Sequence, residues 1–200
     1  MQILIVQAQP DGKSLTAAVI NALRCGVTAA GHAVEVADLC AEVSIAANGK
    51  RILTAITEPG QPHATLRGSR RRSIVPTRWS SSSDLLVVHA GNRESWIDRV
   101  FISGWAFRYE RGKVIGTMRN IPVHVVGIGG GNQLGYDKHG YERSFSTQIE
   151  QGIFRFCGIE CVYVHLMLDS ESAQTDVLAK HLRTAFAIGE TLDLPARGAT

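Results

Sequence analysis

The 200-residue chain lacks a long hydrophobic run, and its charge is nearly balanced. No apolar stretch approaches the roughly 18 residues that a membrane-spanning helix needs, so no membrane span is expected. The start of the chain has no basic region followed by a cleavage site, which predicts a cytoplasmic protein without a signal peptide. A net charge of +3 is too small to indicate nucleic-acid binding by itself.

Cysteine pairs with the spacing of metal or redox sites are also absent. The four cysteines are Cys25, Cys40, Cys157 and Cys161, and no two of them form a C-x-x-C motif. No histidine or second pair completes a zinc-binding set around Cys157 and Cys161. We therefore predict four plain buried thiols and no metal site.

What the sequence does contain is enough apolar residues, 44% of the total, to bury the core of one α/β domain. Residues 3–6 form a short continuous apolar run, typical of a strand buried on both faces of a parallel sheet. Apolar residues then recur at helical spacing from residue 15 to residue 30, with Ser14 as a candidate N-cap and Gly31 as a C-terminal stop. A second strand is predicted at residues 34–38.

The C-terminal half shows the same alternation of predicted strands and helices. Strands are predicted at residues 123–126 and 161–166, and apolar residues recur at helical spacing over 145–156 and 177–186. Residues 85–88 are the candidate third strand. Alternating strands and helices predict a parallel sheet with helices on both faces, and ligands of such sheets bind beyond the carboxyl ends of the strands.

Two loops at strand ends carry candidate binding groups. The loop after the first strand reads Q-P-D-G-K-S-L-T over residues 9–16, and free N–H groups there, with the Ser14 and Thr16 hydroxyls, suit a phosphate. The other loop, G-I-G-G-G at 127–131, would let backbone approach a ligand closely. A capped helix without ligand and a mobile turn are the respective alternatives. Together, at one edge of one sheet, the two loops favour a nucleotide-like ligand.

The seven histidines are scattered along the chain. His124 and His165 fall within strand patterns, so we predict packed or edge histidines. His139 lies with Tyr136 in what the sequence predicts to be a glycine-rich loop beside the cleft. Such a pair would donate a proton to a reduced ligand or orient it, the alternative being two surface residues.

Several motifs resemble the NAD(P)H dehydrogenase (quinone) family of flavodoxin-like proteins. They are the opening I-L-I-V-Q-A-Q-P-D-G-K-S-L-T, W-I-D-R-V-F at 96–101, G-W-A-F-R-Y at 104–109, the glycine run, and F-C-G at 156–158. The resemblance covers residues 1–41 and 96–192. It implies one flavodoxin-like domain, a three-layer α/β/α sandwich with a five-stranded parallel sheet of order 2-1-3-4-5.

The resemblance also implies a homodimeric flavoenzyme that passes two electrons from NAD(P)H through a bound flavin, FAD or FMN, to a quinone-like acceptor. Carried over residue by residue, the positions that hold the flavin phosphate correspond to Ser14, Leu15 and Thr16. Gln9 falls where family members often have histidine, and is assigned to the same site.

The glycine run and the residues after it correspond to the part of the family site that faces the flavin ring. Gly129 and Gly130 match the loop along the isoalloxazine ring. Tyr136 and His139 match residues near the flavin and the hydride path, and are the candidate catalytic residues.

Residues 42–95 depart from the family. They hold eight basic residues against four acidic ones, and three of the six prolines. The family has a proline- and tryptophan-rich loop that packs on the flavin ring just before W-I-D-R-V-F, whereas this chain has H-A-G-N-R-E-S at 89–95. Three consecutive arginines at 70–72 cannot line a buried strand or helix without paired charges, so we predict that this segment packs poorly.

A displaced reading frame is one explanation for the atypical segment. Back-translation of residues 84–95 with G/C-rich codons, shifted by one base, can read T-C-W-W-F-M-P-A-T-A-K, which resembles the family loop. A two-base shift over residues 42–83 likewise yields family-like motifs. The alternative is a genuine divergent insertion, and sequencing of codons 42–95 in the source DNA distinguishes the two.

Two function classes follow from these observations. The first is a flavin-dependent NAD(P)H:quinone oxidoreductase. The second is a flavin-free regulatory or interaction module, or an inactive product, because the ring-packing loop is absent; the fold alone does not choose between them. Nucleic-acid binding through the basic patch at 67–78 ranks below both, since that patch lacks interleaved aromatic residues apart from Trp79.

Overall fold

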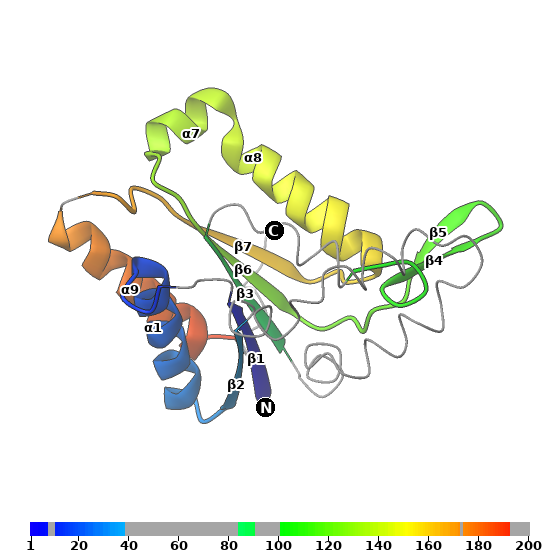
Figure 1. Ribbon diagram of the computed structural model, residues 1–200, viewed down its shortest axis with the longest axis horizontal. Helices are drawn as coiled ribbons and strands as arrows, with labels where there is room; N and C mark the ends of the chain where they lie inside the picture. The colour runs from blue at the N-terminus through cyan, green and yellow to red at the C-terminus, as the bar shows by residue number, and fades with distance from the viewer. Residues whose placement is uncertain (8–10, 39–83, 91–100, 173, 193–200) are drawn as a thin grey trace, which may run out of the picture.

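Five parallel strands form one sheet at the centre of the molecule (Figure 1). The computed structural model describes residues 1–7, 11–38, 84–90, 101–172 and 174–192, with 84–90 described along the backbone only. The strands run in the order β2-β1-β3-β6-β7, which is 2-1-3-4-5 by chain position. Their bounds are β1 Gln2–Gln7, β2 Ala33–Asp38, β3 Asp84–Ala90, β6 Val123–Ile128 and β7 Val162–Met167.

Side chains of the sheet alternate between two separate cores. In β1, Ile3 and Ile5 pack in one core and Leu4 and Val6 in the other, and all four are at most 1% exposed. This burial on both faces is why β1 is a continuous apolar run rather than an alternating one. Helices therefore cover both faces, and the molecule has three layers (Figure 1).

Two helices, α1 (Leu15–Ala29) and α9 (Thr175–Glu190), cover one face of the sheet (Figure 1). The Ser14 side chain accepts a hydrogen bond from the Ala17 N–H and so caps α1, as its sequence predicts. Gly31, at φ 81°, follows the end of this helix in the left-handed region that favours glycine. Both cap predictions are confirmed.

The two helices touch backbone to backbone through a glycine on each. A Cβ at Gly26 of α1 would collide with the Phe186 carbonyl of α9, and a Cβ at Gly189 of α9 would collide with the Leu23 carbonyl of α1. Both glycines are buried. Because neither position has a side chain, the helices approach closely and bury the Leu23 and Val27 side chains completely.

The opposite face is covered by one long helical segment after β6 (Figure 1). It consists of α7 (Gln133–His139), α8 (Tyr141–Ser146), the π-helix η1 (Thr147–Phe154) and the short 3-10 turn η2 (Arg155–Cys157). Ile149 and Phe154 of η1 are buried against the sheet, whereas α7 and α8 contain no buried residue. The helical segment is thus anchored at its π-helical end.

A hairpin of β4 (Phe107–Glu110) and β5 (Lys113–Gly116) lies at the other end of the molecule from α7 (Figure 1). Arg111 and Gly112 connect the two strands, and both have positive φ, 50° and 75°. This is the dihedral signature of the tight turns whose twist matches a hairpin. No pattern in the sequence had indicated this hairpin.

Two histidines of neighbouring strands stack on the α1–α9 side of the sheet. The His124 and His165 rings are parallel within 1°, their centroids lie 5.5 Å apart, and His124 Nδ1 lies 3.2 Å from His165 Nε2. Burial and, second, the charge of His165 lower the pKa of His124 to about 4, and burial also lowers the pKa of His165. The prediction of packed strand histidines is confirmed, and both are held neutral.

The prediction of buried thiols is only partly correct. Cys157 is buried, and burial raises the pKa of its thiol to about 11, so it stays protonated. Cys25 and Cys161 are exposed, because the first lies on the outer side of α1 and the second precedes the buried part of β7. Cys40 lies outside the described residues.

Several other predictions also lie outside the described residues. They are the poor packing of residues 42–83 and 91–95, the basic patch at 67–78 and the position of Gln9. The predicted third strand at 85–88 is confirmed as part of β3. Among the helices of the described ranges, none has the length and apolarity to cross a membrane.

We expect substitution of either crossing glycine by alanine to destabilise the protein. Gly26→Ala and Gly189→Ala should each lower the free energy of unfolding by about 1–3 kcal/mol, because the new methyl group forces two helix backbones apart and outweighs the gain in helix propensity. Urea unfolding followed by circular dichroism measures this change. Gly12→Ala is the control, since no atom lies within 4 Å of its Cβ position; equal stability of all three variants would contradict the close crossing.

The neutral histidine pair predicts a loss of stability on acidification. The unfolded chain takes up a proton on His124 near pH 6.5, whereas the folded chain does so near pH 4. The free energy of unfolding should therefore fall by about 2–3 kcal/mol as the pH drops from 6.5 towards 4. His124→Phe, which keeps a stacking ring without a titrating group, should flatten that part of the profile. His139→Phe, at an exposed position, should leave it unchanged.

Candidate functional site

The first part of the site is the N-terminus of α1, which follows β1 at the carboxyl edge of the sheet. The turn before it is fixed by Asp11, whose carboxylate accepts from the Lys13 N–H at 2.9 Å and whose carbonyl accepts from the Ser14 hydroxyl at 2.8 Å. The Ser14 hydroxyl therefore works inside the turn, as donor to Asp11 and as cap of α1. Its predicted contact with a phosphate stays a prediction.

The backbone amides of this helix N-terminus have the chemistry of an anion site. Within the described ranges, the N–H groups of Leu15 and Thr16 have no hydrogen-bond partner, as expected for the first turn of a helix. The Thr16 side chain is buried beside them. Lys13 adds a positive charge at the same turn. These donors suit a phosphate, with the amides rather than the Ser14 hydroxyl as the principal partners.

The second part of the site is the glycine run that follows β6. It is fastened to the loop after β7 by three backbone hydrogen bonds: Gly129 N to Met167 O at 3.0 Å, Asp169 N to Gly131 O at 2.9 Å, and Ser170 N to Gly129 O at 3.1 Å. Asp169 adopts a left-handed conformation, φ 57°, to make this contact. The run is thus a fixed wall of the site rather than a mobile turn.

Two side chains lie directly against the glycines of this wall. A Cβ on Gly129 would come within 2.8 Å of the Tyr136 hydroxyl oxygen, and one on Gly131 within 3.0 Å of the Tyr136 ring. A Cβ on Gly130 would meet the Glu171 carboxyl group at 3.0 Å. An aromatic ring can therefore lie against this stretch of backbone, which is the property that a ring-binding loop needs.

Tyr136 and His139 lie on the helix α7, so the prediction of a loop at these positions is wrong. Asn132 caps this helix by accepting from the Gly135 N–H at 2.8 Å, and Gly140 ends it at φ 65°. An asparagine cap and a glycine stop bracket seven residues, and that pattern could have identified the helix from sequence.

The structure separates the two candidate catalytic residues. His139 is exposed and stacks on Tyr141, with ring centroids 5.2 Å apart, and Tyr141 meets Tyr136 edge-on at 5.6 Å. Tyr136 thus lies against the glycine wall. The ring of Tyr141 contacts both Tyr136 and His139 and so connects the two residues. No direct hydrogen bond joins the two within the described ranges.

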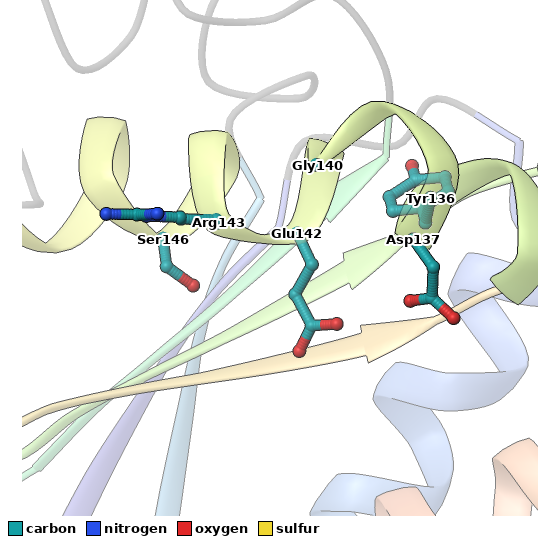
Figure 2. Close-up of a pocket in the computed structure, with 6 residues that line it drawn as sticks. All are labelled: Tyr136, Asp137, Gly140, Glu142, Arg143 and Ser146. Carbon is teal, nitrogen blue, oxygen red and sulfur yellow. The ribbon is translucent and has the colours of Figure 1, made fainter.

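An open pocket of about 460 Å³ adjoins Tyr136 at the bend between α7 and α8 (Figure 2). It is an open surface hollow, and all the residues that line it are at least partly exposed. Sequence reasoning missed it because its walls come from an unpredicted helix and the bend at Gly140. The residues lining it are Tyr136, Asp137, Gly140, Glu142, Arg143 and Ser146. Within the part of the chain that the structure describes, no three metal-ligating side chains gather here or elsewhere.

Comparison with known proteins adds three findings. The family model described as flavodoxin-like fold matches residues 94–187. An uncharacterized NAD(P)H oxidoreductase of Haemophilus influenzae is 30% identical over 76 residues, and this match spans 38% of each chain. The NAD(P)H:quinone oxidoreductase of Methanothermobacter marburgensis superposes with a TM-score of 0.77 at 20% identity, over 98% of this chain and 99% of that one.

A further solved structure is that of an FMN-dependent NADH-azoreductase of Bacillus anthracis in complex with FMN. It superposes with a TM-score of 0.66 at 16% identity, over 96% of this chain and 98% of that one. These structural likenesses confirm the predicted fold. The family model thus covers just under half of the chain, and the sequence motifs resemble the NAD(P)H dehydrogenase (quinone) family of flavodoxin-like proteins.

Proposed function

We propose that this protein is a flavin-dependent NAD(P)H oxidoreductase that reduces a quinone-like acceptor by two electrons. The observation that carries the proposal is that a helix N-terminus with free amides and a run of glycines both follow strands at the carboxyl edge of the sheet. A flavin nucleotide combines a phosphate with a flat ring, so it needs both. The names of the similar proteins, which are NAD(P)H and quinone oxidoreductases, support the same reaction.

The residues of this chain divide the binding of such a ligand between them. The Leu15 and Thr16 amides, at the turn that Ser14 caps, would hold the phosphate. The backbone of Gly129 and Gly130 would lie along the ring. When bound, the flavin supplies the ability to accept a hydride and pass it on.

Tyr136 is the proposed proton donor of the site. Its hydroxyl lies over Gly129 beside the pocket, where it can give a hydrogen bond or a proton to a bound ring system. In the overall reaction NAD(P)H, one proton and the quinone yield NAD(P)⁺ and the hydroquinone. We assign His139 a positioning role, through its stacking on Tyr141.

The remaining parts of the proposal rest on the family resemblance. They are a homodimer, a place in the cytoplasm, and either FMN or FAD as the flavin. The azoreductase in complex with FMN favours FMN.

The proposal predicts a yellow protein with NAD(P)H-consuming activity. Full-length protein from a resequenced gene is titrated with FMN and with FAD and followed by absorbance, and NAD(P)H oxidation is then measured with 1,4-naphthoquinone. Tyr136→Phe should keep flavin binding and lower kcat about 10- to 100-fold, because it removes the proton donor and retains the ring. Tyr109→Phe, an exposed tyrosine of the hairpin, should match the unsubstituted protein.

Protein that stays colourless in excess of either flavin would contradict this function and favour the flavin-free module. Unchanged kcat in Tyr136→Phe would remove that residue from the proton path.

A further inference from the structure

The pocket at the bend between α7 and α8 combines an aromatic ring with two carboxylates. Tyr136 forms one side of it, and Asp137 and Glu142 contribute acidic groups. In Figure 2 the side chains of Asp137 and Glu142 extend to the same side of the helical segment. A face of an aromatic ring and nearby carboxylates both attract organic cations.

The one basic residue that lines the pocket does not neutralise these acids. The Arg143 guanidinium extends along the helix, away from Asp137 and Glu142 (Figure 2). Among the described residues, neither carboxylate takes part in an ion pair, whereas Arg108 pairs with Glu110 and Arg155 with Glu150. The Asp137 carboxylate accepts one neutral hydrogen bond, from the Gln133 side chain at 2.8 Å.

A third carboxylate extends the acidic surface along the glycine wall. Glu171 lies against Gly130, between the two glycines that Tyr136 covers. An anion entering between the pocket and the glycine run would therefore meet negative charge on both sides of Tyr136. A cation would be attracted along the same path.

We propose that this pocket binds flat organic cations and that, as the acceptor site, it selects cationic and neutral aromatic acceptors over anionic ones. The acceptor role rests on the proposed function, but the binding preference does not. Asp137 and Glu142 are the residues that set the preference, and Tyr136 supplies the ring on which the ligand stacks.

Binding of two probes of equal ring size tests the preference directly. The probes are N-methylquinolinium, a cation, and quinoline-2-carboxylate, an anion, and affinity is measured by isothermal titration calorimetry at low salt on the full chain. The cation should bind at least several-fold more tightly. Asp137→Asn/Glu142→Gln should lower the ratio of the two affinities about 5- to 20-fold, and added salt should lower it in the parent protein, because exposed charges are screened.

The matched control is Glu160→Gln/Glu190→Gln. It changes the net charge equally but alters residues before β7 and at the end of α9, at the opposite edge of the sheet. Its affinity ratio should equal that of the parent. Glu142→Gln alone, at an exposed side chain, is a second variant whose folding is not at risk, and it should lower the ratio by a smaller factor. Equal binding of both probes by the parent, or equal ratios in all variants, would overturn the proposal.

Measurement of quinone turnover distinguishes the charge preference of the pocket from the proposed oxidoreductase function. With flavin added, kcat/KM is compared for 1,4-naphthoquinone and 1,4-naphthoquinone-2-sulfonate, and the double pocket variant should gain selectively on the sulfonate. Absence of NAD(P)H oxidation with both quinones contradicts the proposed function, whereas the calorimetric ratio still decides the charge preference of the pocket. Turnover of both quinones with the same relative kcat/KM in every variant refutes the acceptor role.

Discussion

Parallel pairing of the five strands is the constraint on which the candidate site depends. Because β1, β3, β6 and β7 run in one direction, the loops that leave their carboxyl ends meet at the same edge of the sheet. The turn that begins at Asp11 and the wall that begins at Gly129 are separated by more than half the chain, yet they belong to one edge. A single reversed strand would have sent one of them to the opposite end of the molecule.

Glycine serves this fold chiefly by letting backbones and rings come close. At Gly26 and Gly189 it allows the backbones of α1 and α9 to touch directly. The side chains of Leu23 and Val27 in the core beneath them are fully buried. At Gly129 and Gly131 it allows the Tyr136 ring to lie against the loop. The first pair determines the stability of one layer, and the second determines the shape of the site.

Most of the architecture was predictable because its signals are local. The apolar run at 3–6, the Ser14 cap and the Gly31 stop specify β1 and α1 without reference to the rest of the chain. The position of Tyr136 was not predictable in this way, because the glycines before it suggested a loop and outweighed the Asn132 cap. The pocket depends on how α7 and α8 bend at Gly140 and on where their side chains extend, and neither follows from spacing along the sequence.

The π-helical turn η1 links the exposed bend to the buried core and fixes the rotation between them. Its two anchors, Ile149 and Phe154, are five residues apart, a spacing that suits the wider turn of a π-helix and not the 3.6 residues of an α-helix. Loss of one residue within this segment would favour α-helical geometry, and the two anchors would then be four residues apart. The number of residues between Ile149 and Phe154 is therefore matched to the π-helical turn that lets both side chains pack against the sheet.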